Sequence, residues 1–222
     1  MGRARTSDYG NPFVGISVVC GERFSLLGIP CSPKLEAACS SALGVEVKRA
    51  AIDGSGLLGI FCAMNSNGIV IPASASKGER AVLKKLGLNV YAIKGRFSAC
   101  GNNVAVNDKG AIANPNLPRA EVKEIAECLG VEVVQMRIAG YETVGAMCIA
   151  TNKGFLAHAK ASDEEFAALE GALKVRGSAG TLNTGIPFVR LCGFANSKGY
   201  VVGESTTGFE MGRLDEGLAF ID

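Results

Sequence analysis

Tryptophan is absent from the sequence, and histidine occurs once, as His158. A single histidine leaves acid–base catalysis hard to place, because this side chain most often carries such chemistry near neutral pH. Aromatic residues make up only 6% of the chain and lie scattered, whereas proteins that stack single-stranded nucleic acids need clustered aromatic side chains. The composition therefore favours neither histidine catalysis nor single-strand binding.

An excess of charge and a long apolar run are also missing. The formal net charge is +2, which argues against binding driven mainly by phosphate neutralisation. No apolar run approaches the length of a membrane-spanning helix, and the N-terminus lacks a secretory signal pattern. Met1 and Gly2 with Thr6 match a myristoylation pattern, but we interpret Arg3 and Arg5 as part of a frayed terminus. We expect a cytoplasmic protein without membrane contact.

The cysteines form no C-x-x-C pair, and most of them lie within apolar stretches. In a reducing compartment such residues pack as small hydrophobic side chains. We therefore expect neither disulfides nor a metal site, and nothing in the sequence indicates a cofactor. The eight residues are Cys20, Cys31, Cys39, Cys62, Cys100, Cys128, Cys148 and Cys192.

Glycine is abundant, with 29 residues, and its spacing shows an internal repeat. A four-residue turn that ends in glycine follows an apolar run at Gly68, Gly110, Gly154 and Gly199, with separations of 42, 44 and 45 residues. One period earlier, residues 21–24 have the same layout without the final glycine. Five units of about 44 residues therefore account for the chain.

Two further markers repeat in the same register. A glutamate follows each turn and begins a helix-like segment, which suits the positive end of a helix. A short run closes each unit. It begins with glycine in four of the five units and in most of them continues with β-branched residues. The runs begin at residues 44, 87, 130, 173 and 217. We interpret the glutamates as helix-capping residues and not as catalytic ones. They are Glu36, Glu79, Glu121, Glu165 and Glu210.

Each unit is predicted to form a strand, a tight turn, a second strand, a helix and a third strand. In the second unit the strands fall at residues 57–64, 69–72 and 88–93, with a helix at 77–86. The 57–64 run is apolar on both faces, so we expect it to be covered on both sides. The repeats of this single domain span approximately residues 10–56, 57–97, 98–142, 143–186 and 187–222.

A unit of this size cannot bury its apolar face alone, so its neighbours must supply the other wall. Because no terminal unit has the character of a polar cap, we predict that the units close into a five-fold pseudosymmetric α/β propeller. Inner strands line its axis and helices lie outside. Gly59, Gly101 and Gly145 each lie nine residues before a turn glycine, where we expect strands to crowd near the axis.

Five-fold α/β propellers include enzymes that act on guanidine groups through a cysteine, a histidine and carboxylates. That alternative would pair Cys192 with His158. We expect Cys192 to be buried in a strand and inert, and His158 to occupy an ordinary position at a strand end. The letters Gly54-x-Gly56-x-x-Gly59 match a dinucleotide fingerprint but precede a strand instead of opening a helix. We therefore favour a protein without enzymatic activity.

Several short motifs occur in a fixed order along the chain. They are residues 10–15 (GNPFVG), 65–68 (NSNG) followed by Pro72, 98–102 (SACGN) followed by Asn107 and Asp108, 144–145 (VG), 152–158 (NKGFLAH) and 180–185 (GTLNTG). Each is weak by itself, but their order and spacing together resemble the archaeal-type members of the translation initiation factor 6 family. The likeness extends from Gly10 to Phe220.

The resemblance implies a pentein fold and binding to the large ribosomal subunit, on the face that meets the small subunit. Such a factor would block subunit joining sterically and would take part in large-subunit maturation. The implied partner is a ribosomal protein near the sarcin–ricin loop, with adjacent ribosomal RNA. We expect a monomer without a small-molecule substrate.

The resemblance also implies a contact loop at Gly101 and Asn102, and we expect the Asn102 side chain to be exposed. Our geometric extension of this site adds residues on the same ring of loops. They are Arg96, Ser98, Gly59, Ile60, Gly145 and Ala146.

Overall fold

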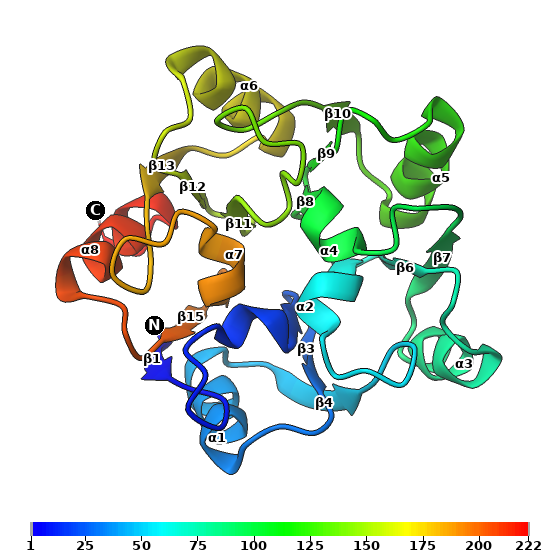
Figure 1. Ribbon diagram of the computed structural model, residues 1–222, viewed down its shortest axis with the longest axis horizontal. Helices are drawn as coiled ribbons and strands as arrows, with labels where there is room; N and C mark the ends of the chain where they lie inside the picture. The colour runs from blue at the N-terminus through cyan, green and yellow to red at the C-terminus, as the bar shows by residue number, and fades with distance from the viewer. Residues whose placement is uncertain (1, 222) are drawn as a thin grey trace.

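Five sheets of three strands stand around a common axis in the computed structural model, which describes residues 2–221 (Figure 1). In each sheet a middle strand pairs antiparallel with an inner strand and parallel with an outer strand. The inner strands of successive sheets lie against one another all the way round. The fold is the closed pentein ring that the repeat predicted.

The inner strands are β2 (Val18–Cys20), β5 (Ala63–Met64), β8 (Val104–Val106), β11 (Cys148–Ala150) and β14 (Gly193–Asn196). The middle strands are β3 (Phe24–Gly28), β6 (Gly68–Pro72), β9 (Ala111–Ala113), β12 (Phe155–His158) and β15 (Gly199–Gly203). The outer strands are β4 (Glu46–Ala50), β7 (Asn89–Ile93), β10 (Val133–Gln135), β13 (Gly177–Gly180) and, for the fifth repeat, β1 (Gly2–Thr6).

A long helix lies at the outside of each repeat (Figure 1). These helices are α1 (Pro33–Ala42), α3 (Lys77–Lys85), α5 (Arg119–Leu129), α6 (Asp163–Leu173) and α8 (Gly208–Gly217). Capping boxes begin three of them, at Ser76, Ser162 and Thr207, each with a glutamate in the third helical position. The prediction that the repeated glutamates cap helices is confirmed for Glu79, Glu165 and Glu210. Glu36 and Glu121 do not cap their helices and instead bind Arg49 and Tyr91.

The inner part of each repeat differs from the prediction. Residues 57–64 were expected to form one strand, but the chain first makes the short helix α2 (Leu58–Phe61) and only then β5. The other short helices are η1 (Val14–Ile16), α4 (Cys100–Asn103) and α7 (Val189–Cys192). An apolar run indicates burial on both sides, yet its period does not distinguish a helical turn from a buried strand.

The N-terminus closes the ring. β1 pairs in parallel with β15 along all five of its residues, from Gly2 beside Gly199 to Thr6 beside Gly203. The expectation of a frayed terminus at Arg3 and Arg5 is therefore wrong. A final strand at residues 217–220 is also absent, because α8 ends at Gly217 and the backbone then turns back toward the helix.

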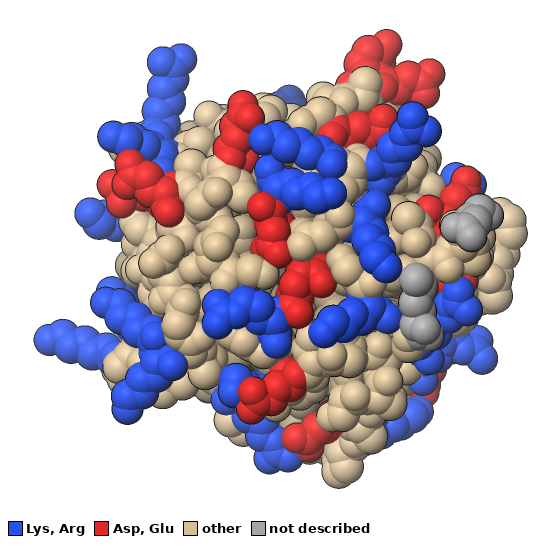
Figure 2. All heavy atoms as spheres, turned by 180° about the vertical axis from the view of Figure 1, so that it is seen from behind, with Lys and Arg blue, Asp and Glu red and all other residues tan. Residues whose placement is uncertain are grey.

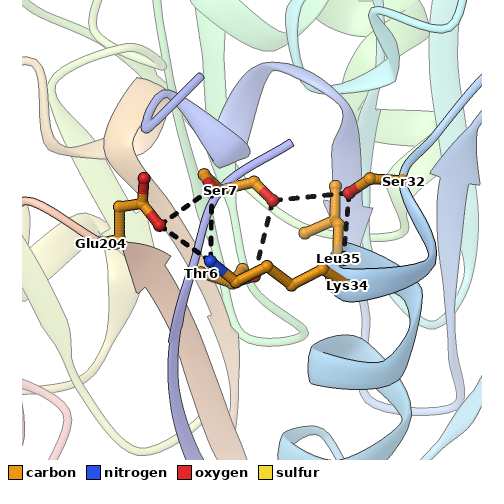
Figure 3. Close-up of polar contacts among 6 residues, drawn as sticks. All are labelled: Thr6, Ser7, Ser32, Lys34, Leu35 and Glu204. Atoms are coloured by element: carbon orange, nitrogen blue, oxygen red, sulfur yellow. Dashed lines mark hydrogen bonds and ion pairs between the residues drawn. The ribbon is translucent and has the colours of Figure 1, made fainter. Parts of the chain in front are cut away.

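Polar side chains reinforce this seam between the fifth and first repeats (Figure 3). Glu204 Oε2 accepts a hydrogen bond from Ser7 Oγ at 2.9 Å and pairs with Lys34 Nζ at 2.8 Å. Ser32, the N-cap of α1, donates from its hydroxyl to the Ser7 carbonyl. The end of β1, the end of β15 and the start of α1 are thus held together.

The hydrophobic core is divided into five clusters, one between each pair of neighbouring repeats. Between the first and second repeats, Leu26 shares a cluster with Ile71 and Leu83 of the next repeat. Across the seam, Leu35 packs in a cluster with Phe194. Since burying one such side chain contributes about 1.5–3 kcal/mol, packing between neighbouring repeats stabilises the ring substantially.

All eight cysteines are free thiols, and six of them are buried. Along residues 2–221, no helix has both the length and the apolar character needed to cross a membrane.

Candidate functional site

The two faces of the ring have different structures. The short helices surround the axis on the face turned toward the viewer in Figure 1, and we call this the short-helix face. The opposite face carries the hairpins between inner and middle strands, and we call it the hairpin face. Figure 2 shows that lysine, arginine, aspartate and glutamate side chains are interspersed over the hairpin face.

The short-helix face repeats one backbone geometry. Phe13, Leu57, Ala99 and Phe188, which precede the short helices, share φ values between −82° and −79° and ψ values between 55° and 67°. The fourth repeat has a turn at residues 144–147 in place of a short helix. The third residue of each short helix, or of this turn, occupies an equivalent position in the five repeats. These residues are Ile16, Ile60, Asn102, Ala146 and Leu191.

Glycines at the second position let the repeats meet at the axis. A Cβ on Gly59 would lie 1.9 Å from the Gly15 carbonyl oxygen, and one on Gly101 would lie 2.1 Å from that of Gly59. A Cβ on Gly145 would likewise lie 2.1 Å from the Gly101 carbonyl oxygen. The predicted crowding is present, and it leaves no room for any side chain.

Four of the predicted site residues are therefore buried. Gly59, Gly101 and Gly145 pack backbone against backbone, and Ala146 is only 4% exposed. They belong to the core of the ring, so a partner can reach them only through their exposed neighbours. Sequence spacing identified the repeated positions but did not distinguish the axis from the surface.

The other predicted site residues do reach the surface. Arg96 and Ser98 are exposed, and the Arg96 guanidinium lies 5.2 Å from the centre of the Phe97 ring. Ile60 and Asn102 are partly exposed. The expectation for Asn102 is met only in part, because its Oδ1 atom is buried and has no hydrogen-bond partner within residues 2–221.

Sequence reasoning missed three exposed apolar side chains on the connecting turns. Tyr9, Leu57 and Tyr141 are 71%, 40% and 45% exposed. The Tyr141 ring packs 5.5 Å from Phe188 and 5.6 Å from His158. Two of the three adjoin a turn glycine, Gly10 or Gly140, and this adjacency was the available signal.

The helix-capping glutamates also fix the connecting turns. Glu79 Oε1 accepts from the Gly54 amide at 3.1 Å, and Glu165 Oε2 accepts from the Ala139 amide at 2.7 Å. Burial alone would raise the pKa of Glu210, but hydrogen bonds from Thr207, Gly185 and other donors lower it. Each such carboxylate ties a helix to the turn before it, so the short-helix face is held rigidly.

Comparison with known proteins now bears on this ring. A sequence model of the eIF-6 family matches residues 3–217. Relatives called translation initiation factor 6 are 34% identical over 219 residues in Haloquadratum walsbyi, covering 98% of this chain and 97% of that protein. Those of Methanoculleus marisnigri and Pyrococcus horikoshii are 36% and 35% identical, over 96% of this chain in both cases.

The chain belongs to the eIF-6 family.

Membership of the eIF-6 family and the names of these relatives place the chain among translation factors. The structure gives this eIF-6 family chain no thiolate–imidazole pair. Cys192, expected mid-strand, is the last residue of α7; burial raises the pKa of its thiol to about 12, so the thiol stays protonated near neutral pH. No hydrogen bond among the described residues joins Cys192 to His158.

His158 has a structural environment. It lies at the end of β12, is 3% exposed, and its Nδ1 accepts a hydrogen bond from the Lys160 amide at 3.0 Å. Burial, together with the charge of Lys160, lowers the pKa of this imidazole. The groove of about 500 Å³ beside it is lined by Tyr141, Lys160 and five other residues, with neither a cysteine nor a carboxylate among them.

Residues 2–221 hold no group of three or more histidine, cysteine, aspartate or glutamate side chains arranged to bind a metal ion.

Proposed function

We propose that this eIF-6 family chain binds the large ribosomal subunit through its short-helix face and thereby prevents premature joining of the small subunit. The observation that carries the proposal is the character of this face. Leu57 and Tyr141 are exposed there, and Ile16, Ile60 and Leu191 are partly exposed around the axis. An apolar centre with a polar rim is typical of protein docking surfaces.

The rim of this face consists of connecting turns, which carry Leu57 and Tyr141 as well as polar side chains and which the capping glutamates hold in place. Arg96 and Ser98 lie on one of these turns and are exposed. The hairpin face carries charges of both signs over its surface (Figure 2). These differences favour the short-helix face as the contact surface.

The proposed activity requires no chemistry, because a rigid ring that occupies the joining surface excludes the small subunit by its volume alone. A net charge of +2 favours a ribosomal protein as the main contact, with adjacent ribosomal RNA as a secondary one. We place the protein in the cytoplasm, where it acts as a monomer and also takes part in large-subunit maturation. The family resemblance points to a partner near the sarcin–ricin loop.

The test is co-sedimentation with purified large subunits, followed by a joining assay with small subunits in the same mixture. The unmodified protein should pellet with large subunits and reduce joining. The double variant Leu57→Glu and Ile60→Glu should weaken binding at least about tenfold, because it would put two charges on the apolar part of the short-helix face. The matched control is Lys109→Glu with Lys153→Glu, which changes two exposed residues of the hairpin face.

Two outcomes would reject parts of this proposal. If the protein stays in the supernatant at about micromolar concentration, well above the dissociation constants of specific complexes, it does not dock on the large subunit. If the hairpin-face variant loses binding while the short-helix variant keeps it, the docking face is the opposite one. His158→Ala should bind and block joining normally, since the proposal assigns His158 no catalytic role.

A further inference from the structure

The axis of the ring contains one deviation from the repeat. Gly15, Gly59, Gly101 and Gly145 occupy the second position of the short turn in four repeats. The fifth repeat has Arg190 there instead, in α7. A Cβ on Gly15 would lie 2.0 Å from the Arg190 carbonyl oxygen, so the arginine backbone completes the same ring of close contacts.

The Arg190 side chain crosses to the first repeat. Its Nη1 donates to the Gly15 carbonyl at 2.8 Å and its Nη2 donates to the Val18 carbonyl at 3.0 Å. Among the described residues no carboxylate forms a salt bridge with this guanidinium. A guanidinium carries five N–H donors, so two carbonyl oxygens leave part of it without an acceptor.

Arg190 also borders a partly open space on the axis. A cavity of about 40 Å³ is lined by residues from all five repeats, including Cys20, Cys62, Cys148 and Ala195. Arg190 is the only charged residue in this lining. About 10–15 Å³ suffices for one water molecule, so the cavity has room for a larger occupant or for several waters.

The thiols around the cavity do not supply the missing negative charge. Burial raises the pKa of Cys20 and of Cys148 to about 12, and it raises that of Cys62 as well. All three therefore remain neutral S–H groups near neutral pH and can act as weak donors. Burial lowers the pKa of Arg190 itself, as expected for a partly buried cation that forms no salt bridge.

We propose that the axial cavity binds a small monovalent inorganic anion, of the size of chloride, on the Arg190 guanidinium. The anion neutralises the single charge in the lining. It also accepts hydrogen bonds from the guanidinium N–H groups that do not bind the two carbonyls. Because Arg190 bridges the fifth and first repeats, the bound anion fastens the seam from the inside.

The experiment compares thermal unfolding in sodium chloride and in sodium methanesulfonate at equal ionic strength. The larger organic anion controls for screening. Chloride should raise the melting temperature in a saturable way, by about 5 °C when it is in roughly 100-fold excess over its dissociation constant. Arg190→Met keeps the length of the side chain without its charge and should lose this chloride-specific rise.

The matched control is Arg80→Met. Arg80 is also partly buried and also donates only to backbone carbonyls, those of Ala73 and Ala75, but it lies on α3 away from the axis. This variant should keep the chloride-specific rise. If the two arginine variants respond alike, the effect does not come from the axis and the proposal is wrong.

Crystals of the unmodified protein soaked in bromide give a second measurement that does not depend on the Arg190 variant folding. The anomalous difference map should show a bromide peak within about 3.5 Å of the Arg190 guanidinium nitrogens. A map with no peak on the axis, together with equal melting temperatures in chloride and methanesulfonate, would mean that the cavity holds only water. Both results are independent of ribosome binding.

Discussion

The seam between the fifth and first repeats differs from the other four junctions in three places. At the outer edge, β1 comes from the opposite end of the chain, whereas β4, β7, β10 and β13 follow their own helices. At the axis, Arg190 takes the position of a glycine. On the connecting turn the carboxylate is on the other partner. At other junctions a helix glutamate accepts from a turn amide, whereas here Asp8 of the turn accepts from the amide of Ser32, the N-cap of α1, at 2.8 Å.

One device is common to the seam and to two other junctions. Asn65, Asn107 and Asn196 each accept from their own hairpin through Oδ1 and donate across the junction through Nδ2. The acceptors are the carbonyls of Leu129, Leu173 and Leu43, at the C-terminal ends of the neighbouring long helices. The Asn-x-x-Gly motif is thus a staple between repeats as well as a turn.

A closed ring therefore needs extra fastening only where the chain begins and ends. Elsewhere the covalent connection between repeats keeps neighbours adjacent, which makes each junction effectively intramolecular over a short loop. At the seam α8 does not lead into the outer strand of its own sheet. β1 takes that place and itself continues into the first repeat, so the missing connection lies between α8 and β1. Backbone pairing of β1, the cluster in Figure 3 and Arg190 replace that connection.

The largest effect is expected from removing β1. A variant without residues 2–6 would expose the edge of β15 and open the fifth sheet, so it should unfold at moderate temperature or associate through the free edge. Thermal unfolding and size-exclusion chromatography would measure this.

The control for β1 is the double variant Arg3→Ala and Arg5→Ala. It keeps the backbone pairing and removes the Arg3–Asp215 ion pair, so its free energy of unfolding should fall by about 1 kcal/mol or less. A deletion variant that melts like the full chain would show that the ring closes without its N-terminal strand.

A smaller loss is expected from filling the axis. Gly101→Ala places a methyl group 2.1 Å from the Gly59 carbonyl oxygen and should reduce the free energy of unfolding by about 1–3 kcal/mol or more. Gly171→Ala on α6 meets no atom within 4 Å and should instead stabilise the fold by about 0.5–1 kcal/mol. Denaturant titration of both variants checks the comparison, and equal effects would contradict it.

Loss of one asparagine staple should weaken a single junction. Asn107→Ala leaves the buried carbonyls of Thr151 and Leu173 without their side-chain donor and should cost about 1–3 kcal/mol. Asn116→Ala changes an exposed asparagine of the same repeat and should stay within about 0.5 kcal/mol. Hydrogen exchange should show faster opening at the third and fourth repeats only in the first variant.

The smallest effect concerns pH. Hydrogen bonds lower the pKa of Glu210 below its unfolded value. Its contribution to the stability of the fold is therefore present above about pH 4.5 and is lost as pH falls through the folded pKa. Glu210→Gln should therefore destabilise the protein near pH 7 and resemble the unmodified protein near pH 3. Glu36→Gln changes a glutamate that binds Arg49 and no connecting turn, so its effect should be slight.

The sequence alone was sufficient for the five-unit ring, the helix caps and the family. The turn glycine repeats in four units and the glutamate after the turn in all five, because each repeat solves a similar packing problem with similar residues. The motifs from residue 10 onward indicated a translation factor, and the family comparison confirmed this. Local rules thus predicted what depends on nearest neighbours in the chain.

Only the tertiary structure decided which strand closes the ring and which repeated residues reach the surface. β1 pairs with residues almost two hundred positions away in sequence, a contact that no local pattern encodes. Gly59, Gly101 and Gly145 occupy equivalent positions that the backbone of the next repeat covers, so their burial depends on how five units meet. Arg190 occupies an equivalent position as well, and it faces a cavity only because the ring is closed around it.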